Sequence, residues 1–407
     1  MRYDIHFRSD VIKKIEDVVE DIYTWNVDDT SAGDEIDSLA EYVVPFDHCV
    51  KPDRPFVVAG ADGSGDFPCV TYGDSVVYLV TAMARAYEAA SFGKLTEMKV
   101  NSADLVDFMW LPADKDKARG RYFDFFERLV DMPLDEICQK SDYYDLAKAH
   151  GSRLPSPVDL IDTLICPEAH DADNIGIQLL STAEAGSLIR LMKAADDLHL
   201  EGKPLYILED TTLALPMVTA KSTLFLEIAK RYACVLAREK SFRYLTISKS
   251  HNMPNMDLIE DMVKKKVPSG EHWFLRIPAT SNGEKKPQFL GTRSIPPIGA
   301  ISYLFKFHRT TQPMRLDMDF QYWKENIWCE DKEEMQKREV QMFRDLDFAS
   351  HDQRCYGYPY PVKACHDMVS LTNDERVALR KQIIDAAVRA GLKRKNFVDP
   401  SVLTGHK

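Results

Sequence analysis

The 407-residue sequence lacks the local motifs of several common enzyme classes. It has no GxxxxGK[ST] loop, so the chain contains no ATP-driven motor of its own. It has no GxSxG nucleophile elbow of the kind that α/β-hydrolases use. The glycines between Gly60 and Gly65 do not form a GxGxxG fingerprint, and Pro68 stands where a dinucleotide-binding helix should begin. These absences disfavour motor, esterase and dinucleotide-dependent functions.

The sequence also lacks cysteine pairs and long apolar runs. Its eight cysteines form no CxxC pair and show no zinc-finger spacing, which argues against a disulfide framework and a zinc module. We expect most of them to be buried free thiols in a reducing compartment. The longest apolar run, residues 76–84, is too short to cross a bilayer, and the first ten residues do not resemble a signal peptide. We therefore expect a soluble protein without a membrane partner, most simply a cytoplasmic one.

The sequence has fewer basic than acidic residues: 52 lysines and arginines against 64 aspartates and glutamates, a formal net charge of −12. Proteins that coat DNA without sequence preference are normally basic, so the balance argues against that class. It leaves room for a nuclease, in which an acidic centre lowers the net charge while a local basic lining holds phosphate. The candidates for such a lining are Lys264–Lys266, Lys285, Lys286, Arg293, Arg309 and Arg315.

Alternating strand and helix patterns predict an α/β fold with a mixed sheet flanked by helices. Short apolar runs predict strands over 56–61, 75–83, 204–208 and 244–247, and a strand pair over 300–307 and 314–318. Residues 27–38 are expected to form an acidic loop. Helical patterns cover 9–25, 121–132, 134–150, 158–166, 181–200, 221–240 and 372–391. We divide the chain into an N-terminal helical segment (1–45), a main domain (46–385) with a helical insertion at about 97–170, and a C-terminal tail (386–407).

Acidic residues follow two of the predicted strands. Asp62 begins the exit of the first strand in Asp62-Gly63-Ser64, where an ordinary turn is the competing explanation. Asp210 ends the strand 204–208, with Glu209 as an adjacent alternative, since only one of two successive residues should face a site. Glu184 stands three residues after a serine, the spacing of a capping box at a helix start.

The segment 357–366, GYPYPVKACH, is the most unusual local pattern in the chain. Its prolines favour an extended entry and a helix start near Pro361, which places Tyr358 and His366 on one rigid unit. Three acids and a histidine suit a hard divalent cation such as Mg²⁺ or Mn²⁺, and one or two such ions activate water for phosphodiester hydrolysis. Lys249, after the strand 244–247, would neutralise a phosphate or orient a water.

In this order the motifs resemble those of the NurA nuclease family. The matching pieces are VVAGADGS (57–64), STAEAGSLIRL (181–191), YILEDTTL (206–213), LTISKS (245–250) and GYPYPVKACH (357–366). The resemblance implies an RNase H-like core and a Mn²⁺- or Mg²⁺-dependent DNA nuclease with 5′-to-3′ exonuclease and single-strand endonuclease activity. It implies a homodimer that docks on a hexameric HerA-type DNA-translocating ATPase, in DNA end resection and repair or in phage defence.

By motif, the resemblance makes Asp62, Glu184 and Asp210 the acidic metal ligands. Tyr358 and His366 complete the site, with His366 as a further metal ligand and Lys249 nearby. One departure concerns Asp210, which is followed by a threonine where the family usually has glycine, so the choice between Glu209 and Asp210 stays open.

The insertion at 97–170 is longer than the family pattern suggests, and it could shape the DNA channel, the dimer or the motor interface. Two other functions remain as alternatives. The first is a catalytically weak or inactive RNase H-like partner of a DNA translocase, and the second is hydrolysis of RNA or another phosphodiester.

Overall fold

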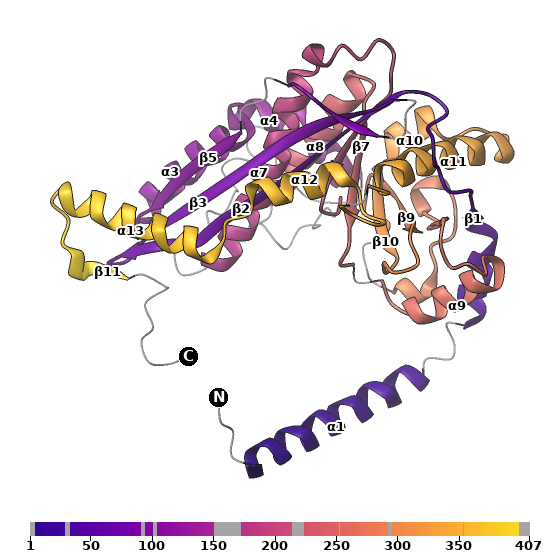
Figure 1. Cartoon of the computed structure of the whole chain (residues 1–407), viewed down its shortest axis with the longest axis horizontal. Helices are drawn as coiled ribbons and strands as arrows, with labels where there is room; N and C mark the ends of the chain where they lie inside the picture. The colour runs from indigo at the N-terminus through magenta and orange to yellow at the C-terminus, as the bar shows by residue number, and fades with distance from the viewer. Residues whose placement is uncertain are drawn as a thin grey trace.

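The computed structural model describes residues 5–28, 33–90, 94–100, 104–149, 172–213, 224–251, 253–291, 295–352 and 354–398. Within these residues the chain forms a mixed sheet of eleven strands with helices on both faces (Figure 1). The strand order along the main path is β1-β8-β9-β10-β7-β6-β2-β3-β4, with β5 paired to β3 and β11 (Phe397–Val398) paired to β2. The α/β class predicted from the sequence is confirmed.

The strands next to β2 have the order of an RNase H-like core. β2 (Phe56–Tyr72) and β3 (Ser75–Ala89) form a long antiparallel hairpin, and β4 (Leu95–Met98) and β5 (Leu105–Leu111) pair antiparallel with β3. On the other side, β6 (Leu205–Glu209) runs parallel to β2, and β7 (Arg243–Ser248) runs parallel to β6. β4 and β5 both pair with the outer side of β3, so the sheet has three antiparallel positions followed by two parallel strands, the arrangement of the RNase H-like core that the motif resemblance implies.

The sheet continues beyond β7 with antiparallel strands. β10 (Met314–Asp319) pairs with β7 and with β9 (Ala300–Lys306), as the sequence predicted for this pair. β8 (Trp273–Arg276) and β1 (Val43–Pro45) complete this half of the sheet. These last two strands were not predicted, because three or four residues are too few to show a hydrophobic period.

Side chains of β2 alternate between two buried cores. Val57, Ala59 and Ala61 belong to the core under helices α3, α7 and α8, whereas Phe56 and Val58 belong to the core under α11 and α12. Both faces of this part of the sheet are therefore covered. The helices are α1 (Ile5–Asp28), α2 (Gly33–Ser38), α3 (Lys115–Val130), α4 (Leu134–Lys140), α5 (Tyr143–Ala149), α7 (Ala172–Lys193), α8 (Leu224–Glu239), α9 (Met256–Lys266), α10 (Phe320–Asn326), α11 (Lys332–Ala349), α12 (Tyr360–Val369) and α13 (Asn373–Arg389).

The predicted strand exit at Asp62 was wrong. β2 passes straight through this residue, and Asp62, Gly63 and Ser64 lie opposite Met83, Ala82 and Thr81 of β3. The hairpin instead turns at residues 73–74, where Gly73 has a positive φ of 61°. Pairing with the neighbouring strand overrides the local turn preference of an Asp-Gly sequence.

The predicted helix start at residue 181 was also wrong. α7 begins at Ala172, so Glu184 lies in the interior of the helix and is no capping-box residue. The helix ends at Lys193 and not near residue 200. By contrast, the capping box at Thr372 and Glu375 is present at the start of α13.

Other segments differ from the sequence pattern in extent. The segment 97–170 is helical in α3, α4 and α5 and also contains β5, while the helix predicted over 158–166 lies outside the described residues. The stretch 27–38, predicted as a loop, includes the end of α1 and all of α2. Six of the seven cysteines in the described part are buried thiols.

Helix α1 carries the predicted apolar stripe on a solvent-exposed face, which includes Val11, Ile12, Ile15, Val18 and Val19. Among the described residues, none of the helices combines the length and the apolar character that crossing a bilayer requires.

Candidate active site

The six predicted site residues lie around the point where β6 ends beside β2. The parallel ladder between the two strands stops at the pair Ala61 and Glu209, whereas β2 continues for several residues. Asp62 is therefore the first β2 residue beyond the end of β6. At this open edge, side chains from both faces of the sheet can approach one another.

Helix α12 brings His366 onto Asp62. The helix crosses β2 so closely at Gly60 that a Cβ there would lie 2.6 Å from the backbone nitrogen of Val362. The Cys365 thiol donates a hydrogen bond to the Gly60 carbonyl at 3.2 Å. Two residues further along β2, on the same face of the strand, Asp62 Oδ2 lies 2.7 Å from His366 Nδ1. The glycine thus permits the close helix–strand contact that positions the histidine.

Glu184 approaches from the opposite face, on α7. A Cβ at Gly63 would lie 3.1 Å from Glu184 Oε1 and 2.6 Å from Leu180 Cδ1, so a larger residue there would displace the ends of both side chains. Glu184 is almost fully buried. Burial, followed by the charges of neighbouring carboxylates including Asp62, raises the pKa of Glu184 well above its usual value. Burial likewise raises the pKa of Asp62.

Asp210 lies on the accessible side of the cluster. Lys249 Nζ is 3.2 Å from Asp210 Oδ2 and 3.8 Å from the centre of the Tyr358 ring. Burial and the Asp210 carboxylate raise the pKa of Tyr358 well above its usual value. The buried Tyr358 hydroxyl has no hydrogen-bond partner of acceptable geometry in the described part of the chain. The side chains of Lys249 and His366 are 53% and 57% exposed, so this side of the cluster is open to solvent.

Glu209 has a different environment from Asp210. It is completely buried, and the Tyr244 hydroxyl donates a hydrogen bond to its Oε2. Burial raises the pKa of Glu209, and the nearby Lys230 opposes this shift. Asp210, with Lys249 and Tyr358 as neighbours, is therefore the one of the two that faces the open side of the cluster.

Lys230 is a residue of this region that the sequence analysis missed. It is buried on α8 and donates hydrogen bonds to Thr211 Oγ1 at 2.9 Å and to the Thr212 carbonyl at 3.1 Å, which fixes the turn after Asp210. Its Nζ lies 4.0 Å from Glu227, whose pKa burial raises to about 7. An acid and a base three positions apart on the otherwise apolar face of α8 are the signal that could have identified it.

The donor set fits a hard divalent cation. Carboxylate oxygens are the ligands that Mg²⁺ and Mn²⁺ prefer, and a cation among Asp62, Glu184 and Asp210 would offset the mutual repulsion that raises the pKa of Glu184. The ligand atoms of this acidic cluster are more widely spread than those of a second group. That second group consists of His48, His272, Asp347 and His351 and lies elsewhere in the fold. Its four ligand atoms, one from each residue, all lie within 4.8 Å of one another.

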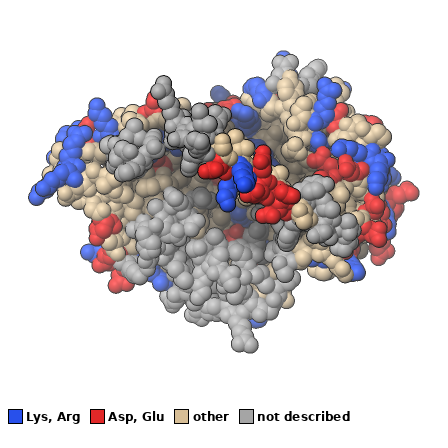
Figure 2. Space-filling model, turned by 90° about the horizontal axis from the view of Figure 1, so that it is seen from below, with Lys and Arg blue, Asp and Glu red and all other residues tan. Residues whose placement is uncertain are grey.

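The basic residues proposed as a lining are dispersed. On the face shown in Figure 2, Lys and Arg side chains gather at the two ends, and both signs of charge meet near a central hollow. Arg315 is buried in an ion pair with Asp317, so the expectation that it lines a surface was wrong. Lys265 and Lys266 contact Asp37 and the Ala40 carbonyl of the N-terminal segment. Arg293 lies outside the described residues, whereas Lys285 and Arg309 are exposed.

No family model matches the chain, and no curated protein matches it. The structure is similar to that of the NurA nuclease from Sulfolobus solfataricus, with a TM-score of 0.49, 11% identity, and coverage of 96% of this chain and 99% of that one. The structure is also similar to that of NurA bound to dAMP and manganese, with a TM-score of 0.40 and 10% identity. That comparison covers 94% of this chain and 98% of the other. For Ciona intestinalis endonuclease V bound to DNA, the TM-score is 0.31 and the identity 10%, with coverage of 88% of this chain and 98% of the other. Two of these structures are NurA nucleases, the family that the sequence motifs resemble.

Proposed function

We propose that the protein is a divalent-metal-dependent nuclease that hydrolyses phosphodiester bonds at the open edge of β2. The observation that carries the proposal is the meeting of a buried carboxylate, Glu184, and a partly buried one, Asp62, from opposite faces of the sheet, with burial raising the pKa of both. Asp62 and Glu184 converge beyond the end of β6, with Asp210 and His366 beside them. Buried carboxylates without matching cations are costly, and such clusters are characteristic of functional sites.

Each residue has a distinct part in this proposal. Asp62, Glu184 and Asp210 would hold the metal, and His366 would complete its ligands or orient Asp62 through their 2.7 Å contact. When bound, the metal would supply an activated water and a countercharge for the leaving oxygen. Lys249, exposed and 3.2 Å from Asp210, would neutralise the phosphate of the substrate.

The Tyr358 hydroxyl, buried beside Asp210 and without a hydrogen-bond partner of acceptable geometry in the described residues, would donate to a phosphate or a water. Its ring holds Lys249 from the other side, at 3.8 Å from the lysine Nζ. Tyr358 therefore links the lysine and the acid on the open side of the cluster.

The finer assignments rest on the motif resemblance. We propose DNA as the substrate, Mn²⁺ or Mg²⁺ as the metal, and 5′-to-3′ exonuclease and single-strand endonuclease activities. We also propose that the protein forms a homodimer and works with a HerA-type hexameric ATPase in DNA end processing or phage defence.

The test is cleavage of end-labelled single- and double-stranded DNA and RNA with Mn²⁺, Mg²⁺ or EDTA. We expect metal-dependent DNA cleavage that is lost in Asp62→Ala and Glu184→Gln. Glu339→Gln is a matched control, because Glu339 is also a buried glutamate with a pKa raised by burial but is hydrogen-bonded by Tyr303 elsewhere in the fold.

Three outcomes would count against the proposal. Equal cleavage by the wild type and the Asp62 variant would remove Asp62 as a ligand. A preference for RNA would replace the substrate. No cleavage under any condition, even with a HerA-type ATPase added, would favour the non-catalytic partner of a translocase.

A further inference from the structure

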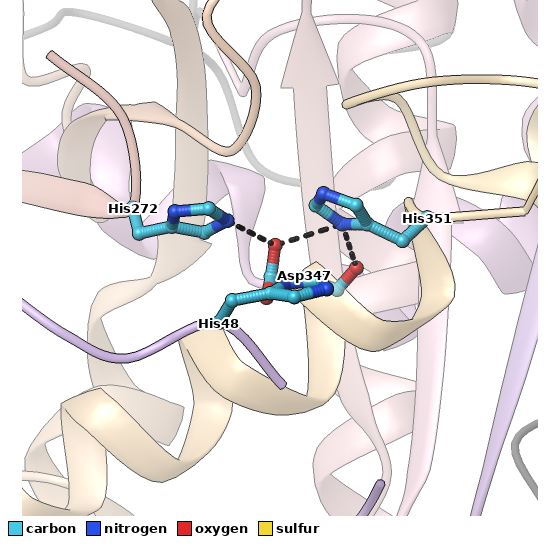
Figure 3. Close-up of side chains that lie close together, drawn as sticks. All are labelled: His48, His272, Asp347 and His351. Carbon is cyan, nitrogen blue, oxygen red and sulfur yellow. Dashed lines mark hydrogen bonds and ion pairs between the residues drawn. The ribbon is translucent and has the colours of Figure 1, made fainter. Parts of the chain in front are cut away.

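Four side chains far apart in the sequence meet away from the acidic cluster. His48 follows β1, His272 precedes β8, Asp347 lies in the last turn of α11, and His351 follows that helix. Figure 3 shows the three imidazole rings arranged around the Asp347 carboxylate. We call this group the histidine cluster; one ligand atom from each residue lies within 4.8 Å of the others.

The centre of the histidine cluster is a buried carboxylate. Asp347 is fully buried, and its Oδ2 accepts a hydrogen bond from the Cys49 backbone N–H at 2.8 Å and lies 2.8 Å from His48 Nδ1. Its Oδ1 lies 3.0 Å from His351 Nδ1 and 3.6 Å from the buried Nε2 of His272, and His351 Nδ1 is also 2.9 Å from the Asp347 backbone carbonyl oxygen. Three imidazole rings therefore contact one buried carboxylate, and among the described residues His272 Nε2 has no hydrogen-bond partner of acceptable geometry.

The ligand atoms lie nearly as close together as those around a tetrahedral metal. Zinc bonds of about 2.0–2.1 Å to nitrogen and oxygen place neighbouring ligand atoms roughly 3.3 Å apart. Asp347 Oδ1 lies 3.0 Å from His351 Nδ1 and 3.6 Å from His272 Nε2, and Oδ2 lies 2.8 Å from His48 Nδ1. One ligand atom of each of the four residues lies within 4.8 Å of the others, so binding would draw the four side chains together around the ion.

We propose that the histidine cluster binds one zinc ion as a structural site separate from the acidic cluster. Three imidazoles and one carboxylate suit zinc, and four protein ligands leave no open position for a substrate. A cavity of about 720 Å³ lined by His48, His351, Lys94 and Arg354 reaches the cluster and provides a route for the ion. The four ligands have none of the local spacing that identifies a zinc module in a sequence, and only the fold brings them together.

The proposed zinc site is joined to the acidic cluster by the short chain segment from His351 to Tyr358. His351 is seven residues before Tyr358, and the Gly357 N–H donates a hydrogen bond to the Ser350 carbonyl at 2.8 Å, which closes the intervening loop. The His351 ring also packs near His308, with centroids 6.2 Å apart. Zinc at the base of this loop would fix the path along which the chain delivers Tyr358 and α12.

The test is metal content and metal-dependent stability of the full-length protein. The protein is stripped with chelator, re-equilibrated with zinc, and assayed for bound metal by mass spectrometry and for Tm. We expect about one tightly held zinc per chain and a Tm that rises with zinc. Cobalt substitution should give the visible absorption bands of a tetrahedral site with nitrogen and oxygen ligands.

Matched variants separate this site from the acidic cluster. His48→Ala and His272→Ala should lose the zinc and the zinc-dependent rise in Tm, and His48 is the safer variant because its side chain is 37% exposed. His308→Ala, a neighbouring histidine outside the cluster, and Asp62→Ala should keep both. The proposal would be overturned if the wild type held no zinc, or if both His48→Ala and His272→Ala kept it. It would also be overturned if Asp62→Ala lost the zinc while the two histidine variants kept it. Tight binding of a different metal only would overturn the choice of zinc.

Discussion

Replacement of Gly60 by alanine should separate His366 from Asp62 without altering either residue. The nearest atoms to the added Cβ are the Val362 backbone nitrogen at 2.6 Å and the Pro361 carbonyl carbon at 2.8 Å. Both belong to the backbone of α12, so no flexible side-chain tip can move aside. Atoms in ordinary contact lie about 3.5 Å apart, and α12 must therefore withdraw by roughly 0.9 Å.

This withdrawal sets the expected magnitudes. A 2.7 Å contact between His366 and Asp62 that lengthens to roughly 3.6 Å is no longer a hydrogen bond. We expect a loss of phosphodiester cleavage on the order of 100-fold, because displacements near 1 Å have effects of this size. Overpacking between β2 and α12 should also reduce the free energy of unfolding by about 1–3 kcal/mol. Cleavage kinetics and denaturant unfolding measure the two effects separately.

Gly120→Ala is the matched control. Gly120 lies within α3, and a Cβ there meets no heavy atom within 4 Å. This variant should keep full activity and gain up to about 1 kcal/mol from helix propensity. If Gly60→Ala cleaves at the wild-type rate and unfolds at the wild-type midpoint, the close packing of α12 on β2 does not position His366.

Three further predictions concern buried charges. Burial and nearby carboxylates raise the pKa of Glu184, so in metal-free protein the folded state binds a proton there more tightly than the unfolded state. The contribution of Glu184 to stability should therefore fall as pH rises above the usual glutamate pKa of about 4.3. Glu184→Gln should flatten this dependence in Tm measurements from pH 4 to 9, and parallel curves would contradict the prediction. Lys230→Met should cost about 1–3 kcal/mol in urea unfolding, because it leaves the Thr211 hydroxyl and a neighbouring carbonyl without their donor; an unchanged midpoint would refute this. Arg231→Met should cost about 3 kcal/mol, since it removes the 2.6 Å partner of buried Asp319, and a loss below the measurement error would show that the remaining arginine suffices.

The buried strands could be predicted because they leave a local trace. Runs 56–61, 204–208 and 244–247 are apolar on both faces, as strands covered on both sides must be. The same locality caused the errors at Asp62 and Glu184. An Asp-Gly pair and a Ser-x-x-Glu spacing resemble a turn and a helix cap, and only pairing with β3 and the earlier start of α7 show otherwise.

The candidate site was predicted as a set of residues but not as a geometry. The motifs named six residues that the fold brings to one edge, yet no pattern indicated that Glu184 and His366 reach it from opposite faces. Lys230 and the histidine cluster left almost no sequence signal. Their partners are distant in the chain, so their role depends on tertiary contacts that a local window does not contain.

The position of α12 in the chain has a consequence for synthesis. His366 contacts Asp62 across 304 positions, so a growing chain presents its acids long before the histidine and tyrosine that accompany them. Because chains are made from the N-terminus and long-range contacts form late, the acidic cluster is completed only when the C-terminal part has emerged and folded. If the protein has the proposed nuclease activity, a chain that ends before α12 should not cleave nucleic acid, because it lacks Tyr358 and His366.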